Sequence, residues 1–168
     1  AAMKGGDLEE AADKWSPEIQ LGMSILIPET YVTDLQLRLG LYRRLAALEK
    51  RADIDAFAAE LVDRFGEMPE EVRHLLDVME VKGLCRNAGI SKIDAGGKGA
   101  VITLYRNTFA NPEGLIQLVQ ASRGALKVMP DQRLVQRATW DLPEARLKGV
   151  RALVQQFADL AMKSKKAA

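Results

Sequence analysis

The stretch Glu60–Leu76, with the sequence ELVDRFGEMPEEVRHLL, predicts the junction between two amphipathic helices. Gly66 can adopt the left-handed conformation that ends many helices. Pro69 suits the first turn of the following helix, where Glu70 and Glu71 meet the positive end of the helix dipole. The stretch therefore predicts two consecutive helices with a short turn between them.

The helix before this turn is expected to run from Asp53 to Phe65. Its apolar residues recur at helical spacing, at Ile54, Phe57, Leu61 and Phe65. At about 100° per residue, Glu60 and Asp63 lie well away from this apolar stripe. The small residues Ala56 and Ala59 lie close beside them. The pattern predicts a flat exposed face with two carboxylates at its border, and we interpret this face as a docking surface.

Two elements are expected before this helix. Apolar and polar residues alternate from Glu18 to Leu21 and the apolar run Ile25–Ile27 follows, which predicts a strand from Glu18 to Ile27 that Pro28 ends. A helix should follow from Thr33 to about Lys50, opened by a capping box. Its apolar residues form two stripes, so we expect it to be largely buried. The first stripe contains Leu35, Leu39, Tyr42 and Ala46, and the second contains Leu37, Leu41, Leu45 and Leu48.

The elements after the turn are expected in the following order: a helix from Pro69 to about Ala88, a β-hairpin from Ile90 to Tyr105, a helix opened by Asn111 and Pro112, two strands at 125–129 and 133–140, and a helix from Pro143 to about Met162. The whole order is strand, three helices, β-hairpin, helix, two strands and C-terminal helix. Without strict βαβ alternation, this order predicts a single compact α+β domain.

This domain is expected to occupy residues 17–162. Residues 1–16 are polar and contain two adjacent glycines, so we interpret them as a linker or an expression remnant. Residues 163–168 are predicted to form a disordered tail.

Composition limits the class of protein. Hydrophobic residues make up 48% of the 168 residues and aromatic residues only 5%, so the core must be aliphatic. One cysteine, Cys85, cannot form an internal disulfide bond. No apolar run approaches the roughly 20 residues that span a bilayer, and no signal peptide is recognisable. We therefore expect a cytoplasmic protein.

The net charge of +1 hides an uneven distribution. Residues 49–80 contain 4 basic and 10 acidic residues, whereas residues 81–168 contain 15 basic and 6 acidic residues. An acidic region repels nucleic acid and attracts a basic protein surface. Helices also carry solvated charge without any partner, so composition alone leaves both interpretations open.

Catalytic or metal-binding patterns are weak. His74 is the only histidine, and Glu70 and Asp77 lie at helical spacing from it, so a local ion pair is the simplest interpretation. Cys85 lies near a helix C-terminus, where the dipole disfavours a thiolate, so a structural role is favoured. Residues 96–99, GGKG, lack the serine or threonine of a P-loop and fit a hairpin turn better. We expect no catalytic residue, cofactor or metal here.

The basic second half of the chain supports an alternative function, a nucleic-acid-binding module. Five of its residues could contact phosphates: Arg133, Arg137, Arg146, Lys148 and Arg151. They are spread over strand, turn and helix without interleaved aromatic residues, so a platform for single strands is poorly supported. A solvated basic face is the simpler interpretation.

Several segments resemble the C-terminal domain of the bacterial transcription-repair coupling factors, known as Mfd or TRCF. They are PEIQL (17–21), ILIPETYV (25–32), LQLRLGLYRRLA (35–46), ELVDRFG (60–66), AGISKI (88–93) and NPEGLI (111–116). Their order and spacing extend the resemblance over about residues 15–162.

The resemblance implies that the chain is part of a longer protein. That protein would be an ATP-driven DNA translocase that displaces stalled RNA polymerase and recruits the excision-repair protein UvrA. The motor motifs are absent from this sequence, so no ATPase activity is expected in this part.

The resemblance also implies a partner for the predicted docking face. The domain would pack on an N-terminal UvrB-like domain of the same protein and mask the surface that binds UvrA. The family's acidic contacts correspond to Glu60 and Asp63, which would face arginines of the UvrB-like domain. The isolated domain is expected to be monomeric.

Overall fold

The computed structural model describes residues 15–167. The predicted linker at residues 1–16 therefore lies outside the described residues, except for its last two. Of these, Trp15 stacks on Tyr105 with ring centroids 4.5 Å apart. The folded domain therefore includes Trp15, which lies just before the expected boundary at residue 17.

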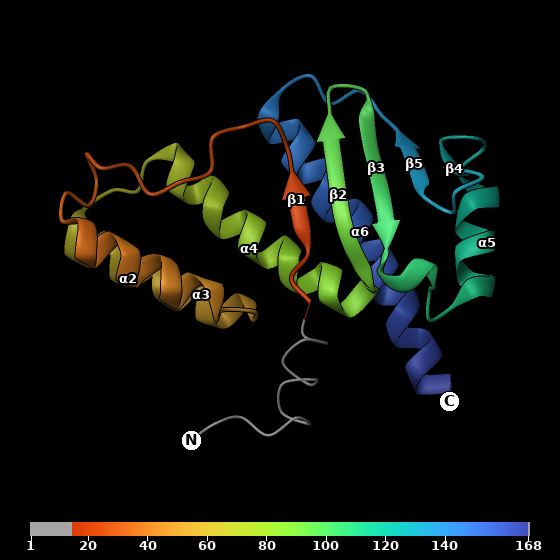
Figure 1. Cartoon of the computed structure of the whole chain (residues 1–168), viewed down its shortest axis with the longest axis horizontal. Coiled ribbons are helices and arrows are strands. Elements are labelled where there is room, and N and C mark those ends of the chain that lie inside the picture. The colour runs from red at the N-terminus through yellow and green to blue at the C-terminus, as the bar shows by residue number, and fades with distance from the viewer. Residues whose placement is uncertain (1–14, 168) are drawn as a thin grey trace.

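A five-stranded mixed sheet lies at the centre of the fold (Figure 1). Its strands are β1 (Glu18–Gln20), β2 (Ile90–Gly96), β3 (Gly99–Leu104), β4 (Leu126–Val128) and β5 (Leu134–Arg137). Their spatial order is β1-β2-β3-β5-β4; β1 is parallel to β2, and the other pairs are antiparallel. On β3, alternate residues are buried, as expected for a sheet with one covered face.

The helices are α2 (Leu35–Ala46), α3 (Arg51–Phe65), α4 (Glu70–Ala88), α5 (Pro112–Ala121) and α6 (Pro143–Ala167), with a short 3₁₀ turn η1 (Tyr105–Asn107). Helices α4 and α6 cover one face of the sheet, whereas α2 and α3 lie beyond α4 (Figure 1). The predicted α+β class, the single compact domain and the order of the elements are confirmed.

Two hydrophobic clusters share α4. The first joins the sheet to α6 and takes Val78, Val81 and Cys85 from α4. The second joins α2 to α3 and takes Val72, Leu76 and Met79 from α4. Helix α4 is therefore buried on two sides, and it positions the α2–α3 pair relative to the sheet.

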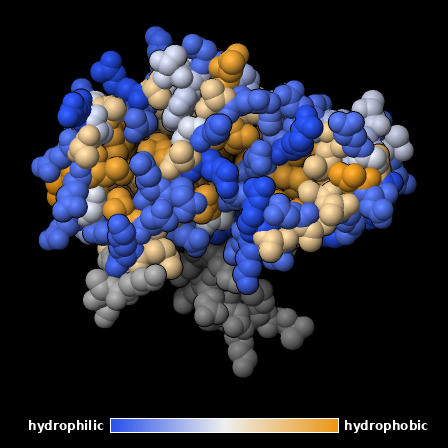
Figure 2. Space-filling model, turned by 180° about the vertical axis from the view of Figure 1, so that it is seen from behind, coloured by the Kyte–Doolittle hydropathy of each residue, from blue (hydrophilic) through white to orange (hydrophobic). Residues whose placement is uncertain are grey.

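Seen from the side opposite to Figure 1, the surface carries hydrophobic patches interrupted by hydrophilic side chains (Figure 2). Within residues 15–167, no helix is long and apolar enough to cross a membrane.

The first predicted strand is much shorter than expected. Only Glu18–Gln20 forms a strand, because Gly22 has a φ of +63° and turns the chain out of the sheet. The apolar run that follows is a loop and not a strand. Its Ile27 is buried in the α2–α3 cluster. The apolar residues of this run therefore pack in the core and do not pair with a neighbouring strand.

The first predicted helix is shorter and less buried than expected. Its cap is Asp34, whose carboxylate accepts a hydrogen bond from Leu37 N at 2.8 Å, and not the predicted Thr33 box. The second apolar stripe is buried in the core through Leu41 and Leu45, whereas only Tyr42 of the first stripe packs against the core. The N-terminal half of the first stripe is open to solvent, since Leu35 and Leu39 are 54% and 41% exposed.

Other helix limits also differ. Pro69 is the N-cap of α4 rather than its first residue. Helix α6 continues to Ala167, past the expected end at Met162, and so includes most of the predicted tail. Lysine and alanine, which dominate that tail, are good helix formers, and lysine is favoured at a helix C-terminus.

The predicted hairpin is confirmed, with a tighter turn than expected. Gly96 pairs with Gly99, so Gly97 and Lys98 alone form the turn between β2 and β3. The GGKG segment is thus a hairpin turn between two strands, which is not the strand-to-helix setting of a P-loop.

Candidate docking surface on α3

Helix α3 presents the predicted face because its apolar stripe is fixed in the core. Ile54, Phe57 and Leu61 are buried against α2 and α4. The helix ends at Gly66, whose φ of +89° favours glycine and whose N–H donates to Val62 O at 2.9 Å. The orientation of α3 is therefore set by its buried side.

The C-terminal end of α3 is further fixed by Tyr31. Its hydroxyl lies 2.8 Å from Gly66 O and 3.1 Å from Leu61 O, two carbonyl oxygens at the helix end. These contacts fix the end of α3 against Tyr31, which lies in the segment before α2. The Tyr31 ring also packs on Phe65, with centroids 5.8 Å apart.

The four predicted site residues lie on the outer side of α3. Ala56, Ala59 and Asp63 are exposed, and the Glu60 side chain is 34% exposed. The structure thus places these residues on one accessible face. The side chains in its middle are the small alanines, and the two carboxylates lie at its border.

Glu60 is held by arginines of its own domain. Its two carboxylate oxygens accept hydrogen bonds from Arg44 of α2 at 2.6 and 2.7 Å, in a bidentate arrangement. Arg64 adds a third hydrogen bond at 3.1 Å. These hydrogen bonds, first from Arg44 and then from Arg64, lower the pKa of Glu60 to about 2.

The two arginines are themselves positioned by aromatic rings. The Arg44 guanidinium lies 4.9 Å from the centre of the Phe57 ring, and that of Arg64 lies 5.0 Å from the Phe65 ring. Such cation–π contacts favour the observed side-chain orientations. Sequence reasoning missed Arg44, because it belongs to a different helix and no spacing in the sequence links it to Glu60.

Asp63 differs from Glu60 in this respect. It is exposed, and its carboxylate makes no ion pair or hydrogen bond within residues 15–167. Of the two predicted carboxylates, Asp63 is therefore the one that is free to pair with an incoming cation.

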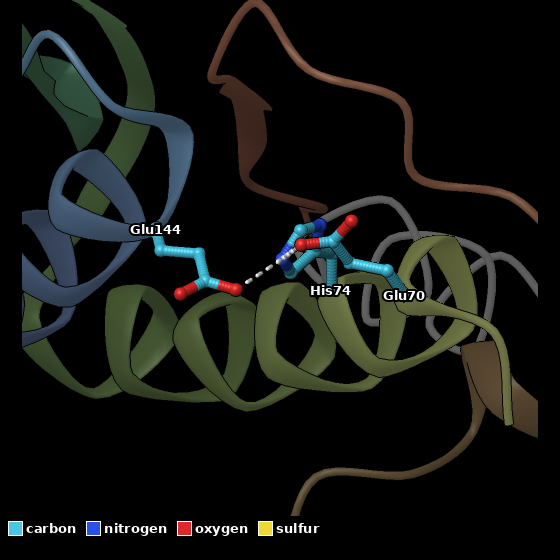
Figure 3. Close-up of side chains that lie close together, drawn as sticks. All are labelled: Glu70, His74 and Glu144. Atoms are coloured by element: carbon cyan, nitrogen blue, oxygen red, sulfur yellow. Dashed lines mark ion pairs between the residues drawn. The ribbon is translucent and has the colours of Figure 1, made fainter.

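A second cluster lies between the starts of α4 and α6 (Figure 3). His74 Nε2 lies 3.8 Å from Glu70 Oε1 and 3.9 Å from Glu144 Oε1. The predicted local contact with Glu70 is confirmed, whereas Glu144 comes from a distant part of the sequence. The other predicted neighbour, Asp77, is partly buried, and this burial raises the pKa of its carboxyl group.

Within residues 15–167, this cluster is the one group of side chains with the spacing of metal ligands. The ligand atoms of Glu70, His74 and Glu144 all lie within 4.8 Å of one another. Both carboxylates are exposed, and they pair with the imidazole when it is protonated. The arrangement is explained by ion pairing between α4 and α6.

Cys85 lies in the core beside the sheet and is fully buried. Burial raises the pKa of its thiol to about 12. A thiol with such a pKa is protonated at neutral pH and is a poor nucleophile. The interpretation of Cys85 as a structural residue is consistent with these properties.

The five basic residues of the alternative function do not form one free surface. Arg133 pairs with Asp131 at 2.6 Å, and Arg151 pairs with the buried Glu80 at 2.5 Å. Arg146 donates to Leu21 O at 2.5 Å. Of the five, only Arg137 and Lys148 lack a partner for their side chains within residues 15–167.

Comparisons with known proteins place the chain in a family. The TRCF domain family matches residues 21–115. Curated proteins named transcription-repair-coupling factor are 39% identical over 119 residues in Rickettsia conorii and 33% identical over 122 residues in Escherichia coli. Both alignments cover 71% of this chain but only 10% of the relative. The chain thus spans about a tenth of the length of these relatives.

A solved structure, the C-terminal domain of a transcription-repair coupling factor, has the same fold. It superposes with a TM-score of 0.71 over 91% of this chain and 96% of the other, at 19% sequence identity. The matched region is a TRCF domain, and no catalytic domain is evident in it.

Proposed function

Because the chain belongs to the transcription-repair coupling factor family, as its C-terminal TRCF domain, we propose that it is an autoinhibitory module. It docks through α3 on the N-terminal UvrB-like domain of the same protein and masks the surface that binds UvrA. The single observation that carries this proposal is the fixed, exposed face of α3, with Asp63 unpaired at its border.

The intact protein, in this proposal, is a DNA translocase driven by ATP that removes stalled RNA polymerase. This chain contributes no catalysis to it. Release of the docked domain exposes the UvrA site, so recruitment of repair follows a shift between closed and open populations. The relatives from Rickettsia conorii and Escherichia coli are bacterial proteins, and the proposed function implies a cytoplasmic location.

The chemistry of the α3 face suits a releasable contact. Ala56 and Ala59 let a partner approach the helix closely, while Asp63 offers an unpaired negative charge. Exposed ion pairs contribute only about 0–1 kcal/mol each, and desolvated pairs contribute more. A few such contacts hold two domains of one chain together without making their separation too slow.

Glu60 has a different role in this contact from Asp63. Its oxygens are already occupied by Arg44 and Arg64, so an arginine of the partner must share the carboxylate with them. Asp63 has no such competitor. We therefore expect Asp63 to contribute more to docking affinity, and Glu60 to contribute to the shape and rigidity of the face.

The proposal is tested by docking in trans. This chain and the separate UvrB-like domain are mixed, and their affinity is measured by calorimetry, followed by competition with UvrA. Asp63→Arg should weaken docking about tenfold, a loss of about 1.4 kcal/mol, because it places a cation opposite a basic surface. In the intact protein, Glu60→Arg combined with Asp63→Arg should increase UvrA binding.

The matched control is Glu113→Arg, which reverses an exposed carboxylate on α5, far from α3 (Figure 1). It changes the net charge by the same amount and should leave docking affinity within about twofold. If Asp63→Arg is folded and docks as tightly as the unaltered chain, the α3 face is not the docking surface.

A further inference from the structure

A wide basic hollow lies at the end of the sheet, away from α3. Its cavity volume is about 700 Å³. It is formed by the β2–β3 turn, the segment that leads into β4, and the end of β5. The lining residues are Lys98, Arg123, Gly124, Ala125, Lys127, Arg137, Ala138 and Thr139. Half of them are cationic and none is acidic.

Backbone hydrogen bonds hold the three segments of the hollow together. Arg137 N donates to Ala125 O at 2.7 Å, and Ala138 N donates to Lys98 O at 3.0 Å. The turn before β4 is tight, with φ values of +54° at Arg123 and +91° at Gly124. The four basic side chains thus project from fixed backbone positions, although they are far apart in the sequence.

These four cations are unpaired, which distinguishes them from most arginines of the chain. Lys98, Arg123, Lys127 and Arg137 are exposed and make no side-chain ion pair or hydrogen bond within residues 15–167. By contrast, six other arginines pair with carboxylates: Arg44, Arg51, Arg64, Arg86, Arg133 and Arg151. Asp141 approaches the neighbouring Gly97 but does not line the hollow.

Four like charges around one hollow repel each other unless an anion lies between them. The hollow has no aromatic residue on which a base could stack, and Thr139 offers its only neutral polar side chain. Such a lining recognises phosphate groups rather than bases. Its width suits a chain of phosphates better than a single small anion.

We propose that this hollow binds the phosphate backbone of a nucleic acid, without preference for sequence. This inference does not depend on docking through α3, since the two surfaces use different residues. It also replaces the basic set expected from the sequence, because the side chains of three of those five residues already have partners within the domain. Of that set, only Arg137 lines the hollow.

The test measures binding of a fluorescently labelled 20-base-pair DNA duplex by anisotropy over a series of salt concentrations. Neutralising about two to four phosphates predicts a slope of about −2 to −4 in log affinity against log salt. The variant Lys98→Gln/Arg123→Gln/Lys127→Gln/Arg137→Gln should bind at least about tenfold more weakly at low salt and show a flatter slope.

The matched control is Arg43→Gln/Lys50→Gln/Arg73→Gln/Lys148→Gln. It removes four exposed cations that also lack a side-chain partner within residues 15–167, so the net charge changes equally. It should retain affinity within about threefold. Circular dichroism and thermal melting should show that both variants are folded, because all eight side chains are exposed.

Three outcomes would overturn the proposal. The first is no binding by the unaltered chain, and the second is an equal loss in both variants, which would indicate net charge alone. The third is displacement of the duplex by a competitor added at the same concentration of negative charge. Displacement by tripolyphosphate would indicate a small-anion site, and displacement by polyglutamate would indicate an acidic protein partner. Displacement by an unrelated duplex, with neither competitor effective, supports it.

Discussion

Glu60 shows how one residue of the docking face depends on a neighbouring helix. Its carboxylate lies between Arg44 of α2 and Arg64 of α3, and the Arg44 pair is bidentate. Bidentate geometry fixes orientation as well as adding charge-assisted hydrogen bonds. Glu60 therefore links α2 to α3 while bordering the surface that we propose to dock.

This arrangement predicts a dependence of stability on pH. The folded pKa of Glu60 is about 2, below its ordinary value of 4.5, so the ionised form stabilises the folded state. This contribution is fully present above about pH 4.5 and is lost as the pH falls towards 2. Glu60→Gln should lower the free energy of unfolding at pH 7, and its difference from the unaltered chain should shrink as the pH falls to 2 and disappear below it.

Urea denaturation at pH 7 and at low pH provides the measurement. Arg44→Gln serves as the comparison, because it removes the other half of the same pair. The two substitutions should be non-additive when combined. An equal effect of Glu60→Gln at both pH values would contradict the assignment of the pKa shift to this pair.

Residue positions on α3 could be predicted from sequence, but their partners could not. Helical spacing alone places Asp63 and Glu60 away from the buried Ile54, Phe57 and Leu61. The pairing of Glu60 with Arg44 depends on how α2 crosses α3, which periodicity does not encode. The proposed partner of the docking face is a domain outside this chain. Its identity therefore came from the family resemblance and not from the spacing or charge of these residues.

At the scale of the elements, two helical glycines mark close contacts between elements. A Cβ at Gly149 of α6 would overlap the indole of Trp140, which packs on the helix backbone. A Cβ at Gly83 of α4 would lie 3.0 Å from Glu49 O, in the connection between α2 and α3. These glycines let α6 and α4 approach their neighbours.

Gly149→Ala should therefore destabilise the domain, although alanine is the better helix former. Moving the Trp140 ring aside should cost about 1–3 kcal/mol of unfolding free energy, as overpacking generally does. Gly40→Ala in α2 is the matched control, since its Cβ would meet only the flexible Arg43 side chain, at 4.0 Å. That substitution should stabilise the domain by up to about 1 kcal/mol.

Thermal unfolding of both variants measures the difference. If Gly149→Ala is as stable as Gly40→Ala, the packing of Trp140 on α6 is not tight. A fluorescence shift of Trp140 in Gly149→Ala would accompany the expected destabilisation, because the ring must change its surroundings.

The elements themselves were predictable where local signals agree. Asn111 caps α5 by accepting a hydrogen bond from Gly114 N, as the sequence predicts for a helix opened by Asn111 and Pro112. Prediction was wrong where apolar residues serve tertiary packing. The run before Pro28 has a strand-like pattern, yet its buried residues anchor a loop. The first apolar stripe of α2 is mostly exposed, although it carries as many apolar residues as the buried second stripe.

At the scale of the whole molecule, α4 joins the α2–α3 pair to the sheet and α6. Glu80 of α4 is the one charged residue in the buried set of residues 15–167, at 7% exposure. It pairs with Arg51 at the start of α3 and with Arg151 of α6, whose Nε lies 2.6 Å from Glu80 Oε1. One carboxylate thus connects both hydrophobic clusters across their shared helix.

Glu80→Ala should weaken both parts of the molecule together. Removing a buried ionic partner generally costs about 3–5 kcal/mol, but both arginines are half exposed and can be hydrated, so we expect about 1–3 kcal/mol. Glu80→Met keeps the volume and should recover part of this loss. Hydrogen exchange should accelerate in α3 and in α6 alike, whereas Glu67→Ala, which alters an exposed carboxylate, should change neither. Faster exchange in only one of the two helices would show that Glu80 does not couple them.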